Sequence, residues 1–361
     1  MWAIVVKEFR ELRRDRRMVA LMVAVPLLLL VVFGYAARFD VHSVPAEVVG
    51  PGAAHAARSL PPLFDVTRVR PAEGRSGAVS DLRTGDYAAA VVTPGAAGAG
   101  SGELLVDGAN LFDAQAVTRA VAQAHLAVPV TVMFNPRLNT SWIMVPGVIG
   151  ILLVFVGTLA TSLGVVRERQ TGTLEQLAVM PFRPSDVFIG KVAPYFLLAS
   201  LDTVVVVAAG LGLFGVPFRG SVGVFVLGSL LFLFVTLSIG VLISSVSENQ
   251  GQAIQLTMMT LLPQILMSGF VFPVASMGVG VRWISFLLPL TYFVEISRGV
   301  MLRAAPIGAL WFPLAMLAAL GAAAFALSIV RFRRDLAPNI AAPPSPPAPA
   351  AREAVAGGEA R

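Results

Sequence analysis

Side chains that could do covalent chemistry are few in this sequence, and they are not grouped. It has no cysteine, and its histidines His42, His55 and His125 do not have the HExxH spacing of a zinc protease. The Gly190-Lys191 pair is followed by valine and lacks the earlier glycine of a GxxxxGK[ST] phosphate-binding loop. We therefore expect no catalytic residue, no metal ligand and no cofactor bound by this chain.

Ionisable side chains within or beside long apolar runs form a second group. Asp202 is the only formal charge inside six such runs, so we expect it to face the helix bundle, a cavity or a partner. It is a candidate for a substrate path, and a helix-end position or a structural hydrogen bond is the alternative. Glu295 and Arg298 are three residues apart, so they either pair on one helix or belong to a gate.

Two glutamines and one phenylalanine complete this candidate path or gate. The side chains of Gln255 and Gln264 can join neighbouring helices by hydrogen bonds inside a membrane. Phe270 follows the methionine-rich stretch TMMTLLPQILM, which suits either an adaptable apolar path or ordinary core packing. The residues alone fit either interpretation.

The elements that carry these residues are predicted to lie in a membrane. The chain is 56% hydrophobic and 13% charged, whereas soluble domains have about 45–50% and about 25%. A helix of about 20 apolar residues crosses about 30 Å of hydrocarbon. The predicted spans are residues 18–37, 143–166, 192–216, 222–246, 253–272 and 307–330.

The segments between the spans are more polar. Residues 38–140 contain short β-branched runs bounded by Gly, Pro and Asp, and residues 112–132 have helical spacing, which predicts a small α/β or α+β domain. Residues 276–303 are too polar for a span and are broken by proline, so a re-entrant or interfacial hairpin is expected. Residues 1–17 form an amphipathic interfacial helix and the Pro/Ala-rich residues 331–361 a disordered tail.

Basic residues predict how this chain crosses its membrane. They gather before the first predicted span, after the last one and in residues 167–191, so both termini and that segment are expected in the cytoplasm. The long segment 38–140 is then extracytoplasmic. We expect a multi-pass protein of a plasma membrane, the inner membrane in a bacterium. The net charge of +6 is explained by this asymmetry, and no nucleic-acid partner is expected.

One dense polar segment separates the second and third predicted spans, with the sequence RERQTGTLEQLAVMPFRPSDVFIGK. Gly172 can end the preceding helix. Thr173 and Gln176 have the spacing of a capping box, which predicts the start of a short helix, and Pro181 ends that helix. This segment, which we call the elbow, is either a connector lying on lipid headgroups or a docking helix for a cytoplasmic partner.

The elbow resembles the cytoplasmic signature of type-2 ABC exporter permeases. NPRLNTSWIMVPGVIG, LISSVSENQGQAIQL, LMSGFVFPVASM and LLPLTYFVEISRGVML are similar to further motifs of these permeases and occur in the same order. VPAEVV, LRTGDYAAAVVTP and VDGAN resemble the large ectodomain of the multidrug-type branch. The resemblance covers about residues 1–335. It implies an α-helical polytopic membrane protein with six transmembrane helices and a small α/β extracytoplasmic domain.

The resemblance also implies a function and partners. This chain would be the permease subunit of an ATP-driven exporter of drug-like, lipid or other amphipathic substrates. ATP-Mg would bind to separate ABC ATPase subunits, and the other partners would be a second permease protomer, as a homodimer or heterodimer, the bilayer and a periplasmic adaptor. The implied ATPase-coupling residues are Arg167, Glu168, Gly172, Thr173, Leu174, Glu175, Gln176, Leu177, Pro181, Gly190 and Lys191.

Two other classes of protein fit less well. A membrane-embedded enzyme would need converging acid, base or nucleophile side chains within its spans, and Asp202 is alone there. A membrane-anchored sensor or scaffold that displays residues 38–140 would need one or two spans, not six.

Overall fold

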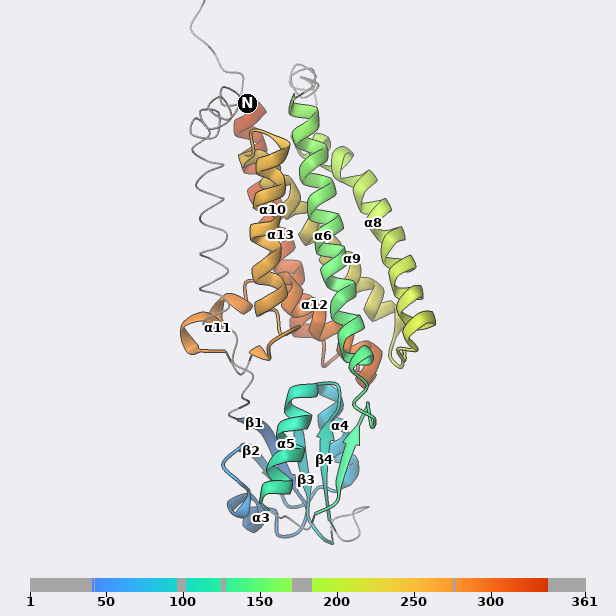
Figure 1. The fold of residues 1–361 in the computed structure, drawn as a ribbon, viewed down its shortest axis with the longest axis vertical. Helices are drawn as coiled ribbons and strands as arrows, with labels where there is room; N and C mark the ends of the chain where they lie inside the picture. Colours follow the sequence, from blue (N-terminus) through green and yellow to red (C-terminus); the bar gives the residue numbers. More distant parts are fainter. Residues whose placement is uncertain are drawn as a thin grey trace, which may run out of the picture.

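The computed structural model combines a helical bundle with an α/β domain at one of its ends (Figure 1). It describes residues 41, 43–95, 102–124, 128–170, 184–274 and 277–336. The predicted interfacial helix 1–17, the predicted span 18–37, most of the elbow and nearly all of the tail therefore lie outside the described residues.

The α/β domain, which we call the sheet domain, is built on a five-stranded sheet in the order β2-β1-β3-β4-β5. Strand β1 is parallel to β2 and β3, β4 is antiparallel to β3, and β5 is parallel to β4. The strands are β1 (Val44–Val49), β2 (Phe64–Arg70), β3 (Ala89–Val92), β4 (Glu103–Asp107) and β5 (Val130–Met133).

Helices cover both faces of this sheet. Leu104 and Val106 of β4 pack in the core that includes α5, whereas Leu105 points the other way, into the core that includes α4. Successive side chains of a strand point to opposite faces, so burial on both faces explains the nearly continuous apolar runs of the strands. The helices are α3 (Ala53–Ser59), α4 (Arg75–Thr84) and α5 (Leu111–Gln123).

The helix predicted over 112–132 is wrong in its second half. Helix α5 ends at Gln123, and the next ordered element is β5, which pairs with β4. Pro129 cannot continue a helix, and the β-branched residues that follow it favour a strand. The apolar spacing continued across this change of element, so periodicity alone did not show it.

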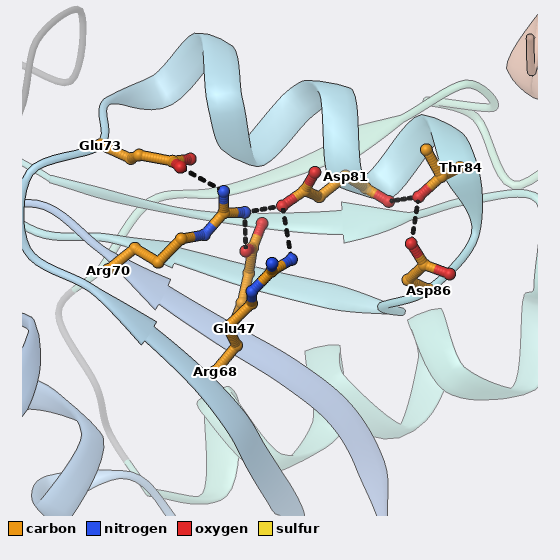
Figure 2. Close-up of polar contacts among 7 residues, drawn as sticks. All are labelled: Glu47, Arg68, Arg70, Glu73, Asp81, Thr84 and Asp86. Carbon is orange, nitrogen blue, oxygen red and sulfur yellow. Dashed lines mark hydrogen bonds and ion pairs between the residues drawn. The ribbon is translucent and has the colours of Figure 1, made fainter. Parts of the chain in front are cut away.

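A network of ion pairs fixes helix α4 to the first two strands (Figure 2). Arg70, the last residue of β2, forms ion pairs with Glu47 of β1, with Glu73 before α4 and with Asp81 of α4. Its Nη2 atom is 2.8 Å from Glu47 Oε2. Burial raises the pKa of the Glu47 carboxyl above its ordinary value, although Arg70 opposes this effect. The positive charge of Arg70 neutralises these carboxylates, and the resulting ion pairs join β1, β2 and α4 of the sheet domain.

The bundle has four described helices that are long and apolar enough to cross a membrane: Thr140–Glu168, Val192–Phe214, Val222–Val246 and Trp311–Arg331. They belong to α6 (Thr140–Gln170), α8 (Pro184–Phe214), α9 (Val222–Val246) and α13 (Trp311–Leu336). Helix α9 is the central one, since 61% of its span is buried and it contacts α6, α8 and α13.

Small and hydroxyl-bearing residues let α9 approach its neighbours closely. A Cβ atom at Gly240 would lie 2.8 Å from the Thr158 carbonyl oxygen of α6. Thr158 donates from Oγ1 to the Thr236 carbonyl oxygen at 3.3 Å, and Ser328 of α13 donates to the Ser238 carbonyl oxygen at 3.0 Å. Such contacts replace the hydrophobic effect, which does not drive helices together inside lipid.

The fifth predicted span, 253–272, differs from the structure in length and in character. Helix α10 runs over Gln250–Met267 and is not among the four helices that could cross a membrane. Four glutamines lower its hydropathy, and Gly269, in the left-handed region at φ 82°, lies in the bend that follows the helix. Residues 268–272 are therefore outside the helix.

Helix α9 has the bounds predicted for it, 222–246, whereas three other helices depart from theirs. Helix α6 begins before 143 and ends after 166, and α8 begins inside the elbow at Pro184. Helix α13 begins at Trp311 rather than at 307 and continues to Leu336, so the first residues of the predicted disordered tail are helical. In the segment predicted as a hairpin lie two short helices, α11 (Val279–Ser285) and α12 (Pro289–Arg298), and the π-helix η2 (Gly299–Arg303). They lie at the end of the bundle that faces the sheet domain, the sheet end (Figure 1).

Candidate functional site

Helices α6, α10 and α12 of the bundle meet at the sheet end. Arg298, the last residue of α12, donates from Nη1 to the Gly269 carbonyl oxygen at 3.2 Å and from Nη2 to the Phe270 carbonyl oxygen at 3.4 Å. The Phe270 ring lies against Gly147 of α6, where a Cβ atom would overlap it. We call the set Gln264, Ser268, Gly269, Phe270 and Arg298 the junction.

The junction contains buried polar atoms without partners among the described residues. Gln264 and Ser268 are each only 1% exposed. Their side-chain oxygens, Gln264 Oε1 and Ser268 Oγ, have no hydrogen-bond partner there, and neither has Arg298 Nε. Burying such a group unpaired costs about 1–3 kcal/mol. A polar molecule that enters the junction could supply the missing partners.

The structure does not pair Glu295 with Arg298. Glu295 is exposed on α12, and the guanidinium group of Arg298 is turned to the carbonyl oxygens that follow α10. Three of the predicted path or gate residues, Gln264, Phe270 and Arg298, are thus brought together, with Glu295 one turn away.

Gln255 and Asp202 do not belong to the junction. Gln255 lies nine residues before Gln264, which is about 14 Å along the helix. Its Oε1 atom is buried without a hydrogen-bond partner among the described residues. Asp202 is half-buried in the middle of α8, which does not form part of the junction.

Directly after Arg298, the π-helix η2 connects the junction to the sheet domain. Arg303 Nε is 3.0 Å from Asp107 Oδ2, and the two side chains are 15% and 2% exposed. The guanidinium group also fills the space beside Gly85 at the end of α4, where a Cβ atom would overlap Arg303 Nη1. Arg303 therefore holds the end of η2 against two elements of the sheet domain.

A second arginine, Arg219 in the α8–α9 loop, makes a parallel contact. It donates from Nη1 to the Phe134 carbonyl oxygen of the sheet domain at 2.8 Å and to the Leu302 carbonyl oxygen of η2 at 3.2 Å. Its guanidinium carbon lies 5.8 Å from the centre of the Trp142 ring, in the cation–π range. Two arginines thus join the bundle to the sheet domain.

Asp113 adds a titratable group to this contact. It lies in the first turn of α5, and Asn110 donates from Nδ2 to its Oδ2 atom at 2.5 Å. Burial, and to a smaller extent the nearby Asp107 carboxylate, raise the pKa of Asp113 from 3.8 to about 7, and Arg303 opposes the shift. The charge beside the Arg303–Asp107 pair therefore changes near neutral pH.

The predicted ATPase-coupling residues lie at the opposite end of the bundle, the elbow end. Arg167 is exposed and Glu168 is half-buried in the last turns of α6, and Gly190 and Lys191 belong to the first turns of α8. Gln250 Nε2 donates to Gln170 Oε1 at 3.2 Å, which joins the start of α10 to the end of α6. The predicted residues from Gly172 to Pro181 lie outside the described residues.

Sequence reasoning did not single out Arg219, Arg303 or Asp107. Their partners are 83 to 85 residues away for Arg219 and in another domain for Arg303. The available signal was weak: Arg219 is the only charged residue between the third and fourth predicted spans, 192–216 and 222–246.

Comparison with known proteins places these ends in a family context. A family model described as "ABC-2 family transporter protein" matches residues 16–330. In Escherichia coli strain K12, the "Probable multidrug ABC transporter permease YbhS" is 27% identical over 333 residues, which is 83% of this chain and 88% of that protein.

Two further relatives in the same organism match a shorter part. The "Probable multidrug ABC transporter permease YbhR" is 33% identical over 207 residues, 56% of this chain and 55% of that protein. The "Inner membrane transport permease YhhJ" is 33% identical over 212 residues, 56% of this chain and 54% of that protein. The chain spans about half the length of these two relatives. The family match covers most of the chain, and the protein belongs to the ABC-2 family of transporters.

Proposed function

We propose that this chain is the membrane-spanning permease subunit of an ATP-driven exporter. The observation that carries the proposal is the ABC-2 match over residues 16–330. The 361 residues contain no GxxxxGK[ST] loop, so ATP is hydrolysed by a separate ABC ATPase, which binds the elbow. Two permease protomers assemble, and the cargo is amphipathic, either drug-like or a lipid; the relatives named as multidrug permeases support this class.

We place the elbow end in the cytoplasm and the sheet domain outside it. The basic residues of the elbow and those that follow the apolar part of α13 support this orientation, because positive charge gathers on the cytoplasmic side. The inner-membrane permease YhhJ supports a bacterial inner membrane. We propose a periplasmic adaptor as a further partner of the permease.

Within this function the junction is the proposed extracytoplasmic gate. Its unpaired atoms, Gln264 Oε1, Ser268 Oγ and Arg298 Nε, would bond to a polar group of the cargo as it leaves. Arg303 and Asp107 couple this gate to the sheet domain, so movement of α12 would move the sheet domain with it.

Co-purification tests the permease assignment. The tagged chain is expected to retain a Walker A ATPase encoded beside its gene. Glu175→Arg, in the elbow, should abolish this retention at normal membrane levels, whereas Asp65→Arg on the exposed side of β2 should not. A chain that never retains an ATPase would contradict the permease proposal, and wild-type retention by Glu175→Arg would instead make the elbow a connector.

Charge exchange tests the gate. Arg303→Asp and Asp107→Arg should each reduce ATP-driven ethidium transport by proteoliposomes that contain the permease and its ATPase, because each leaves a buried charge unpaired. The double variant restores opposite charges and should recover part of the transport. Arg282→Asp, an exposed change in α11, is the control. Normal transport by both single variants would remove the sheet domain from the gating mechanism.

A further inference from the structure

A groove between α8 and α9 is not used by the proposed gate or by the elbow. It has a volume of about 560 Å³ and opens on the side of the bundle. Leu233 and Phe225 form part of its buried floor, whereas Val204 of α8 and Val226 of α9 are 65% and 46% exposed on its rim. An occupant would therefore enter sideways, from the surroundings of the spans.

The wall of this groove offers no hydrogen-bond donor to an occupant. Its three hydroxyl side chains already donate to carbonyl oxygens of their own helices: Ser200 to Phe196 at 2.7 Å, Thr203 to Ala199 at 2.7 Å and Ser229 to Phe225 at 2.9 Å. The remaining lining residues are apolar. An occupant must therefore be apolar along the whole groove.

The length and position of the groove match one leaflet of a bilayer. On α8 it extends from Ser200 to Leu211, which is about 17 Å along the helix. A leaflet contributes about half of the 30 Å hydrocarbon core. The groove continues to Phe218 and Val222 at the sheet end, so it lies in the leaflet nearer the sheet domain.

The polar end of an occupant would meet a positive charge. Arg219 directly follows the lining residue Phe218, in the loop between α8 and α9, and is exposed, although its Nη1 atom donates to the Phe134 and Leu302 carbonyl oxygens. The Nε and Nη2 atoms of this guanidinium group are further donors, which are complementary to the phosphate of a lipid headgroup. An apolar chain of leaflet length that ends in an anion is the chemistry of an anionic phospholipid.

We infer that the α8–α9 groove is a binding site for one acyl chain of an anionic phospholipid, whose phosphate lies at Arg219. The bound chain fills the space between α8, of which only 17% is buried in its span, and the central helix α9. This site is separate from the proposed gate, so it does not depend on which cargo is exported.

Photocrosslinking of the full chain in proteoliposomes tests this inference. The probe is phosphatidylglycerol with a diazirine on one acyl chain, competed by unlabelled phosphatidylglycerol, and labelled peptides are identified by mass spectrometry. We expect saturable labelling of α8 and α9 at the groove. Val207→Trp, which fills the groove, should remove most of it, and Leu197→Trp, which is 70% exposed on α8 outside the groove, should not.

The headgroup contact has its own comparison. Arg219→Gln should weaken labelling by phosphatidylglycerol several-fold and leave labelling by a diacylglycerol with the same diazirine unchanged, while Arg219→Lys should retain most of the phosphatidylglycerol labelling. Equal labelling by both probes in the wild-type protein would overturn the phosphate contact.

Two results would overturn the acyl-chain site. One is labelling spread evenly over the exposed faces of α8 and α13 and unaffected by Val207→Trp. The other is a groove occupied by a second copy: because the chain has no cysteine, Val204→Cys would then form disulfide-linked dimers in the membrane and the groove would resist labelling. Elution of each variant as wild-type protein shows that it has folded.

Discussion

Three arginines at the sheet end join segments that are far apart in the sequence. Arg298 donates to carbonyl oxygens that follow α10, Arg219 donates to carbonyl oxygens of two domains, and Arg303 pairs with Asp107. Guanidinium has five donors in a planar fork, so one side chain can join several elements. Asp113 differs from these groups because its charge is not constant near neutral pH.

The raised pKa of Asp113 predicts that the sheet domain loses stability as the pH rises towards neutrality. Its folded pKa of about 7 lies above the ordinary 3.8, so the folded state holds the proton more tightly. The stabilisation is complete below about pH 4 and is lost as the pH rises through about 7. The difference corresponds to about 4 kcal/mol. Calorimetry of the full chain at pH 5 and pH 8 should show the decrease.

Asp113→Asn is the matched variant for this prediction. It keeps the shape of the side chain and removes its titration, so its melting temperature should change less than that of the wild type between pH 5 and pH 8. Equal changes in both proteins would assign the pH dependence to another group.

The sequence predicted the individual polar residues better than their partners. The i, i+3 spacing of Glu295 and Arg298 allowed an ion pair, but the end of α10 lies beside Arg298 and offers it two carbonyl oxygens instead. Arg303 and Asp107 meet only because β4 ends towards the bundle. Such pairs depend on the packing of distant segments, which no local pattern contains.

At the scale of helices, the approach of α6 to α9 predicts opposite effects for two glycines. A Cβ at Gly240 would lie 2.8 Å from a backbone oxygen of α6, so Gly240→Ala must push the helices apart, at a cost of about 1–3 kcal/mol. Gly212 of α8 has no atom within 4 Å of such a Cβ, so Gly212→Ala should be neutral or stabilise by up to about 1 kcal/mol.

Thermal unfolding of the two variants in the same detergent measures this difference. Gly240→Ala should melt at a lower temperature than the wild type, and Gly212→Ala at the same or a higher one. The same loss in both variants would mean that the close α6–α9 approach at Gly240 does not decide the stability.

Hydrophobic length predicted α6, α8, α9 and α13 well enough to place their residues, because 18 or more apolar residues have few alternatives to a span. It failed where polar and apolar signals were mixed. The glutamines of α10 lie in a segment that is helical but less apolar than a span. The β-branched residues of β5 continue the apolar spacing of a helix and also suit a strand, and pairing with the neighbouring strand β4 decides for the strand.

At the scale of the whole molecule, α6 connects the two proposed functional ends. Its first turns lie at the junction, where Ser297 donates to the Pro146 carbonyl oxygen at 3.4 Å, and its last residue, Gln170, contacts α10 at the elbow end. Its 31 residues extend over about 46 Å, more than the hydrocarbon core requires. A displacement imposed at the elbow can thus reach the junction through one continuous helix.

This arrangement requires the two ends to lie on opposite sides of the membrane, which a topology reporter can measure. Asp107 of β4 faces the bundle through Arg303, so Glu103, four residues earlier, lies about 13 Å further from it. An insertion at Gly100, shortly before Glu103, is therefore expected to leave the contact with the bundle intact. Alkaline phosphatase, which is active only outside the cytoplasm, should be active when inserted there.

The same reporter should be inactive at Gln250, where α10 begins at the elbow end, and after Ile340. Both sites are expected at the elbow end, where basic residues gather in the elbow and after the apolar part of α13, and positive charge is retained in the cytoplasm. Immunoblots of each fusion show whether it is made in equal amounts, so that a lack of activity reports location. Activity at Gln250 together with inactivity at Gly100 would show the opposite orientation in the membrane. The elbow would then lie outside the cytoplasm and could not bind a cytoplasmic ATPase.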